Sequence, residues 1–166
     1  MTDNMDIFNG KRYFSFGSYL KRKFGVRVYK ISVDAGFSCP NRDGTLSSGG
    51  CIFCDNASFR VRASKNVSGI SGQLKANANA MSERYRARAF IAYFQHFTNT
   101  YASFDTLKSY YEEALQVDGV LGLAIGTRPD CVTSELLDYL NELGEKYHIW
   151  LEYGVQSANN DTLRKI

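Results

Sequence analysis

The fold of this chain follows from residues 28–54, VYKISVDAGFSCPNRDGTLSSGGCIFC, in which an apolar run leads directly into a loop with three cysteines. Val28–Val33 is rich in β-branched residues and predicts a short strand. Ser38–Gly50 is rich in Gly, Ser and Asn and predicts a loop. Because this loop comes directly after the strand, we expect it at the carboxyl edge of an α/β sheet, where such proteins bind their ligands.

Strands and helices alternate along the rest of the chain. Three more β-type runs cover Phe90–Phe94, Val120–Ile125 and Ile149–Tyr153. Helical patterns lie between them, from Gly72 to about Arg88, over Phe104–Val117 with Ser103 as N-cap, and over Ser134–Lys146 with Thr133 or Ser134 as N-cap. This alternation predicts βαβ units, and therefore parallel strands with helices on the outer face of the sheet.

The domain organisation that we expect is one α/β unit, a partial (β/α) barrel. Residues 1–27 form an N-terminal extension and residues 28–166 the first part of the barrel, which is truncated after about the fourth strand as a helix begins at Asp161–Ile166. Four strands with outer helices leave one edge and the concave face of the sheet open to water. We therefore expect a piece of a longer protein, or one that a partner completes.

The bulk properties point to a cytoplasmic protein. The 166 residues suffice for one domain, and no apolar run reaches the roughly 18 residues that a membrane span needs. The N-terminus lacks the basic flank and apolar stretch of a signal peptide, so we expect no membrane association. In a reducing compartment, the four cysteines are better interpreted as metal or catalytic ligands than as disulfides.

The net charge of +3 is unevenly distributed along the chain. Residues 1–90 carry 15 Lys and Arg against 6 Asp and Glu, whereas residues 91–166 carry 5 against 11. A basic half suits a polyanionic partner, but ordinary solvated charge is the simpler interpretation of this pattern.

Cys39, Cys51 and Cys54 have the spacing C-x11-C-x2-C, and the close pair can ligate one metal centre from a tight turn. In a 4Fe–4S cluster, three thiolates leave one iron open to the amino and carboxylate groups of S-adenosylmethionine (SAM). In a zinc site, Cys131 or His96 would be the fourth ligand. The spacing does not decide between the two, but the position of all three cysteines after one strand favours the cluster.

The segments ISVDAGFSCPNRDGT (31–45) and GGCIFC (49–54) resemble the start of radical SAM proteins of the YhcC/YtqA type. These are near relatives of the catalytic subunit of Elongator and of oxygen-independent coproporphyrinogen oxidase. The resemblance runs from about Phe14 to Ile166. It implies a partial radical SAM (β/α) barrel and an enzyme with two cofactors, a 4Fe–4S cluster on the three cysteines and SAM. Such enzymes reductively cleave SAM to a 5′-deoxyadenosyl radical, which abstracts hydrogen from a substrate, here unknown.

Two motifs carry part of the expected SAM pocket. Phe53, just before the last cysteine, matches the residue that leans on the adenine in this family, and core packing is compatible with that role. Residues 95–100, QHFTNT, look like the GGGTPS stretch of the porphyrinogen oxidases. Thr98 takes the threonine place, and Gln95 offers a side-chain amide where the family has glycine.

Two later motifs complete the resemblance. Residues 125–130, IGTRPD, are similar to the ETRPD motif of the Elongator subunit, with Gly126 in place of its glutamate. Arg128 and Asp130 could hold the cofactor or the substrate, or simply pair to shape a turn. We expect the adjacent Cys131 to be a small buried residue. Residues 151–157, LEYGVQS, match a GVQS motif in which Gln156 points toward SAM.

Partners follow only from the resemblance. Some relatives act on tRNA wobble uridines, which makes tRNA one candidate substrate for the basic half, and a reductant such as flavodoxin or ferredoxin is implied. The sequence identifies no catalytic side chain, and we expect the isolated chain to be inactive because half of the barrel is missing. The alternative is a zinc-stabilised nucleic-acid-binding module without catalysis.

Overall fold

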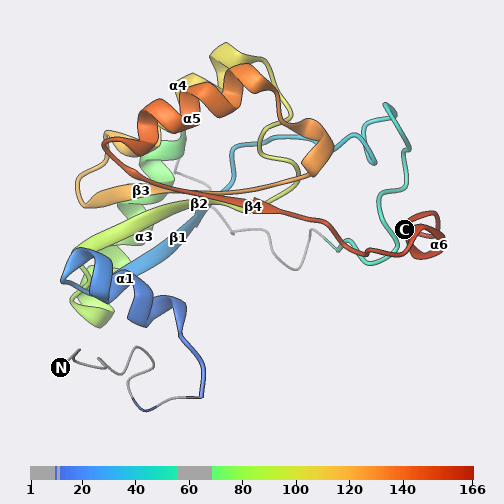
Figure 1. Cartoon of the computed structure of the whole chain (residues 1–166). Helices are drawn as coiled ribbons and strands as arrows, with labels where there is room; N and C mark the ends of the chain where they lie inside the picture. Colours follow the sequence, from blue (N-terminus) through green and yellow to red (C-terminus); the bar gives the residue numbers. More distant parts are fainter. Residues whose placement is uncertain (1–9, 11, 56–68) are drawn as a thin grey trace.

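The protein is an α/β unit built on one parallel sheet. The structure, a computed structural model, describes residues 10, 12–55 and 69–166. Residues 1–9 and 11 of the predicted extension, and residues 56–68 of the predicted barrel, lie outside the described residues. The strands are β1 (Val28–Val33), β2 (Ala89–Phe94), β3 (Val120–Thr127) and β4 (His148–Tyr153). All pairs are parallel and lie in sequence order, so every strand ends at the same edge, on the right in Figure 1.

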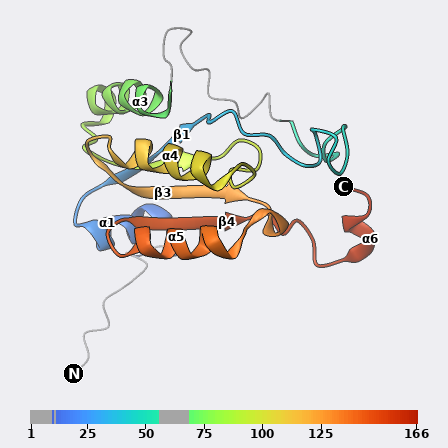
Figure 2. The same ribbon diagram turned by 90° about the horizontal axis from the view of Figure 1, so that it is seen from above.

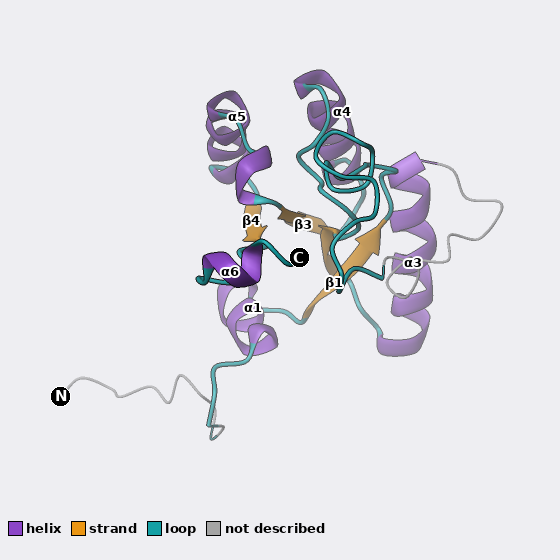
Figure 3. Cartoon of the chain, turned by 90° about the vertical axis from the view of Figure 1, so that its right-hand side faces the viewer, coloured by secondary structure: helices purple, strands orange, loops and turns teal. Residues whose placement is uncertain are grey.

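The helices that connect the strands all pack on one face of the sheet. They are α3 (Gly69–Tyr85), α4 (Phe104–Leu115) and α5 (Ser134–Gly144), and Figure 3 shows them as an arc around the strands. The main core lies between this arc and the outward side chains of the strands, with Val33, Phe94 and Ile125 fully buried. The predicted parallel sheet with outer helices is therefore confirmed, and the strand bounds differ from the prediction by at most two residues.

The starts of α4 and α5 and the end of α3 show how the sequence determines where helices begin and end. The hydroxyls of Ser103 and Thr133 accept the backbone N–H of Thr106 and Leu136, which confirms both predicted N-caps. Helix α3 was predicted to reach about Arg88 but ends at Tyr85. It ends there because Arg86 adopts a left-handed φ of 55°, with its N–H bonded to the carbonyl of Ser82.

A helix that the sequence reasoning missed covers the other face of the sheet. Helix α1 (Phe16–Phe24) begins at an N-cap serine, Ser15, and ends at Gly25, which has a φ of 72°. Its Leu20 is buried against small or β-branched side chains, Val28, Ala89, Ile91 and Ala124. The expectation that this inner face is open to water is therefore wrong near the amino ends of the strands, where part of the predicted extension packs on it.

The carboxyl edge of the sheet is more open. Figure 2 shows the loop that follows β1 and the short helix α6 (Asn160–Leu163) at this edge, beyond the strand ends. Among the described residues, no helix has the length and apolar character that crossing a bilayer requires.

Replacing Arg86 by glycine tests the reason that α3 ends where it does. A non-glycine residue in the left-handed region costs about 1 kcal/mol, so Arg86→Gly should raise the free energy of unfolding by about that amount. Arg84→Gly is the matched control: it lies inside the last helical turn and should lower the free energy of unfolding by about 1 kcal/mol. Chemical denaturation measures both, and equal effects of the two substitutions would contradict this explanation.

Candidate functional site

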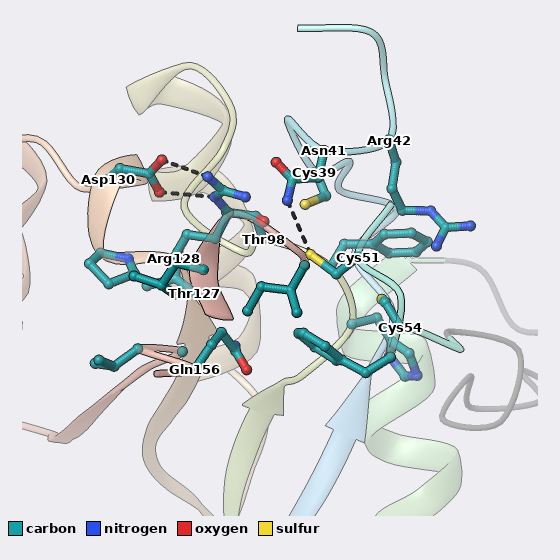
Figure 4. Close-up of a pocket in the computed structure, with 18 of the residues that line it drawn as sticks. Cys39, Asn41, Arg42, Cys51, Cys54, Thr98, Thr127, Arg128, Asp130 and Gln156 are labelled. Atoms are coloured by element: carbon teal, nitrogen blue, oxygen red, sulfur yellow. Dashed lines mark hydrogen bonds and ion pairs between the residues drawn. The ribbon is translucent and has the colours of Figure 1, made fainter. Parts of the chain in front are cut away.

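The carboxyl edge of the sheet surrounds a cavity of about 580 Å³. All the cluster and cofactor residues predicted from the sequence line it: Cys39, Cys51, Cys54, Phe53, Gln95, Thr98, Arg128 and Gln156. They come from the segments after all four strands, so the parallel topology brings together residues that are more than 100 positions apart. Figure 4 shows the cysteines on one side of the cavity and Arg128 on the other.

The cysteine loop folds back on itself to bring its thiols to the cavity. The carbonyl of Cys39 accepts the N–H groups of Arg42 and Asp43, and the N–H of Gly50 donates to the carbonyl of Asn41 at 2.7 Å. A second tight turn closes where the N–H of Cys54 bonds to the carbonyl of Cys51. These bonds return the close pair to the neighbourhood of the first cysteine.

The three thiols are chemically suited to hold an iron–sulfur cluster. Each is half-buried and free of a disulfide, and the Asn41 side chain donates an N–H to Sγ of Cys51 at 3.1 Å (Figure 4). Such donors stabilise a thiolate ligand and tune its metal. Among the described residues, no three His, Cys, Asp or Glu side chains surround one ion position.

The two proposed fourth ligands of a zinc site lie differently. His96 is buried and lines the cavity. Cys131 is not part of the cavity wall, and its thiol donates to Oδ1 of Asp130 at 3.7 Å. Cys131 is half-buried rather than buried, which corrects the sequence-based expectation. Its place on the short 3₁₀ turn η1 (Pro129–Cys131) leaves it partly open to water, and burial together with the nearby Asp130 raises the pKa of its thiol.

Asn99 joins the ends of β2 and β3 from within the core. It is 1% exposed, and its side-chain amide donates to the carbonyls of Phe94 at 3.0 Å and Gly126 at 2.8 Å. The backbone carbonyl of Asn99 accepts the hydroxyl of the buried Tyr111. Sequence reasoning missed this residue although it lies within the quoted QHFTNT segment, because an amide in a polar loop gives no signal that it is buried.

The neighbouring loops are held to one another in the same way. The N–H of Thr98 donates to the carbonyl of Ser38 at 3.1 Å, which ties the loop after β2 to the cysteine loop. The N–H of Gly154 donates to the carbonyl of Thr127 at 2.9 Å, which ties the end of β4 to the end of β3. The cavity wall is therefore one connected hydrogen-bonded rim.

The β2 loop presents two of the predicted residues. Oε1 of Gln95 accepts the hydroxyl of Ser32 at 3.2 Å, which fixes the amide at the end of the strand. Thr98 is 1% exposed and forms part of the cavity wall. Between them Phe97 has a left-handed φ of 62°, and the guanidinium of Arg42 lies 5.9 Å from the centre of its ring.

Arg128 and Asp130 form a two-point ion pair on the wall opposite the cysteines. Nε donates to Oδ1 at 2.9 Å and Nη2 to Oδ2 at 2.6 Å (Figure 4). The hydrogen bonds from Arg128 hold the pKa of the Asp130 carboxyl below its usual value. The pair stands at the start of η1 and also lines the cavity. Its position is therefore compatible with both expectations, an ion pair that shapes a turn and a pair that holds a ligand.

Gln156 and Phe53 complete the cavity. Gln156 has a left-handed φ of 64°, and its amide lies over Gly154 so closely that a Cβ on that glycine would stand 2.7 Å from Nε2. Phe53 is 53% exposed, so its ring is not part of the core and the core-packing interpretation is wrong. It lines the cavity instead.

A polar cluster that the sequence reasoning missed lies on the inner face of the sheet. Nζ of Lys30 on β1 contacts Oε1 of Glu152 on β4 at 2.5 Å, and the hydroxyl of Tyr93 on β2 donates to Oε2 of Glu152 at 2.7 Å. Nζ of Lys30 also lies 3.8 Å from the centre of the Tyr93 ring. Burial and the neighbouring Glu152 raise the pKa of Tyr93. The sequence contained one sign of this cluster: Lys30 and Glu152 are each a single charged residue within an otherwise mostly apolar strand.

Fold and site together define a parallel α/β protein with a cysteine-lined cavity at the carboxyl ends of its strands. The chain is 45% identical over 152 residues to protein YhcC of Escherichia coli strain K12, and 41% identical over 152 residues to uncharacterized protein YtqA of Bacillus subtilis strain 168. It is 37% identical over 158 residues to uncharacterized protein MJ0486 of Methanocaldococcus jannaschii.

These similarities cover 91–93% of this chain but only 47–48% of each relative. The chain therefore spans about half the length of the curated relatives that it matches. No family model and no solved structure matches it.

Truncating Asn99 tests whether the rim depends on that amide. Asn99→Ala removes the buried side-chain donor from the carbonyls of Phe94 and Gly126, and Gly126 keeps only the backbone N–H of residue 99, so the free energy of unfolding should fall by about 2–3 kcal/mol. Asn79→Ala, at an exposed position of α3, is the control and should cause no loss. Chemical denaturation measures the difference, and equal stability of the two variants would show that the amide holds nothing together.

Proposed function

We propose that this chain is part of a radical SAM enzyme, with a 4Fe–4S cluster on Cys39, Cys51 and Cys54 and SAM in the adjoining cavity. The observation that supports this most is that the eight cluster and cofactor residues, drawn from the motifs after four different strands, line one cavity. Bound there, cluster and SAM would supply a one-electron reductive cleavage, driven by an external reductant, that would release methionine and a 5′-deoxyadenosyl radical able to abstract hydrogen from the substrate.

The fold that we propose for the whole enzyme is a (β/α) barrel of which this chain forms a part. The Lys30–Glu152 contact joins the two edge strands across the inner face. Three strand spacings separate β1 from β4, about 14 Å in a flat sheet, so this contact favours a sheet that curves toward its inner face. The relatives, about twice as long, have enough additional sequence for the remaining strands.

The cysteine loop has the features that cluster ligation needs. Its backbone turns fix two of the thiols, and the Asn41 N–H donates to Sγ of Cys51, as outer hydrogen bonds to metal ligands do. The loop residues from Arg42 to Gly49 are exposed. A reductant of the flavodoxin or ferredoxin type would approach the cluster over this surface.

The rest of the cavity offers groups that match the parts of SAM. The exposed ring of Phe53 suits stacking on the adenine, and the amide of Gln156 can both donate to and accept from uncharged groups. Arg128, held in place by Asp130, presents its remaining N–H groups to a carboxylate of the cofactor or the substrate.

Gly126 stands where the related motif has a glutamate, so this chain has no side-chain carboxylate at that position. Glu152 is the register partner of Gly126 on β4 and extends over the same inner face, so a carboxylate remains one strand away. A Cβ on Gly126 would meet only ordinary contacts, the nearest at 3.4 Å from the carbonyl of Phe94.

Cluster assembly tests the cysteine assignment. After anaerobic reconstitution, the chain should hold about four irons with an equal amount of sulfide and should absorb visible light. Each of the variants Cys39→Ala, Cys51→Ala and Cys54→Ala should lose most of this iron and absorption. Cys131→Ala is the matched control and should retain the full iron content, because this thiol lies outside the cavity wall.

Purification also separates the zinc alternative. A colourless protein with one tightly held zinc after aerobic handling, which Cys131→Ala or His96→Ala releases, would contradict the cluster. A zinc module without catalysis would then be the better interpretation.

SAM binding tests the position of Gln156. In Gly154→Ala the new methyl group displaces the Gln156 amide, so the dissociation constant for SAM should rise about tenfold, as expected for one lost hydrogen bond. Gly126→Ala adds the same methyl group where only ordinary contacts surround it, and should change the constant little. Calorimetry on reconstituted protein gives both values, and similar affinities for the two variants would exclude a role for Gln156.

A further inference from the structure

Four arginines gather at the opposite edge of the sheet, where the strands begin. Arg27 and Arg88 directly precede Val28 and Ala89, which are register partners in β1 and β2, so the two arginines start neighbouring strands side by side. Arg84 and Arg86 lie at the end of α3, which leads into β2. All four are exposed. We call Arg27, Arg84, Arg86 and Arg88 the arginine edge.

Among the described residues, no acid forms an ion pair with these arginines. Glu83 stands next to Arg84 in the sequence and Asp118 lies in the turn before β3, and both are exposed. The arginine edge is therefore a local excess of positive charge, which the charge balance of the sequence suggested but did not locate.

Two stacked tyrosines hold part of the arginine edge in place. The rings of Tyr29 and Tyr85 are stacked with their centres 5.8 Å apart. The guanidinium of Arg27 lies 5.4 Å from the centre of the Tyr29 ring, and that of Arg84 lies 5.2 Å from the centre of the Tyr85 ring. Cation–π contact restricts these side chains before a ligand binds, so less conformational entropy is lost on binding.

Arg86 adds an independent observation. It occupies a left-handed position at the end of α3, where glycine is the favoured residue. The position therefore carries a charged side chain at a cost in backbone strain. Strain of this kind is commonly retained at functional positions.

We propose that the arginine edge binds the phosphate backbone of a nucleic acid. Arginine forks match phosphate oxygens in two-point contacts, and a row of four matches a ligand that repeats its anionic group. Tyr85 lies among these arginines and is 48% exposed, so it supplies the aromatic component that single-stranded ligands prefer. An acidic protein is the competing ligand, but the exposed aromatic ring among the arginines favours a nucleic acid, on whose bases such a ring can stack.

This inference does not rest on the proposed enzyme function. A six-residue strand spans about 20 Å, so the arginine edge and the cysteine-lined cavity lie at opposite ends of the sheet. A nucleic acid bound at the arginine edge leaves the cavity open, and a fault in one site leaves the other intact.

Binding of a labelled single-stranded RNA, followed by fluorescence anisotropy over a range of salt concentrations, tests the proposal. Four phosphate contacts predict a slope of about −3 in log K against log salt. Arg27→Gln with Arg88→Gln should weaken binding about tenfold at low salt and reduce the slope by about 1.4. Lys75→Gln, an exposed charge earlier on α3, is the control and should leave the slope unchanged.

Arg86→Gly separates binding from folding. It should reduce the slope by about 0.7 while the melting temperature stays the same or rises, because the substitution relieves backbone strain. Cys51→Ala should bind RNA like the unaltered chain, which keeps a failure of the cluster proposal distinct from a failure of this one. Absence of RNA binding at low salt, or binding that the arginine substitutions do not change, would overturn the proposal. So would competition by polyglutamate as effective as that by unlabelled RNA.

Discussion

The cavity depends on a set of hydrogen bonds that join the carboxyl ends of the strands to one another. Backbone and amide donors at Thr98, Asn99 and Gly154 each bond to a carbonyl of a neighbouring strand end or loop. In a parallel sheet these ends are where ladder bonding stops, and buried carbonyls there need other donors. The residues that supply the donors also fix where the loops begin, so the same bonds that complete the sheet position the side chains around the cavity.

The inner face of the sheet is divided between two kinds of contact along its length. Near the amino ends, α1 covers it with the buried Leu20 and leaves an apolar interior. Nearer the carboxyl ends, Lys30, Tyr93 and Glu152 replace apolar packing with a charged, hydrogen-bonded cluster. None of the three lines the cavity, but Tyr93 and Glu152 each stand two residues before one that does, Gln95 and Gly154.

Local patterns predicted the strands because each strand is a short apolar run. The cofactor residues of the cavity came from the family resemblance, whose motifs each follow one of these strands. The same patterns did not predict α1, whose apolar residues Phe16, Tyr19 and Leu20 pack on the inner face of the sheet, a contact that the local sequence does not reveal. They placed the end of α3 too late because Arg86 turns the chain without a glycine to mark it. Contacts such as that of Lys30 with Glu152 join the first and last strands of the sheet, and no single strand encodes them.

The four arginines of the arginine edge can be read in the sequence, but only the pairing register of β1 and β2 shows that Arg27 and Arg88 lie side by side. Arg27 and Arg88 are 61 positions apart, yet each stands directly before a strand, and β1 pairs with β2 from its first residue. In a parallel sheet, residues that precede neighbouring strands share an edge, just as residues that follow them do. The rule that gathered the cavity residues at one edge therefore gathers these arginines at the other. A sequence search that reads both ends of every predicted strand would have found both.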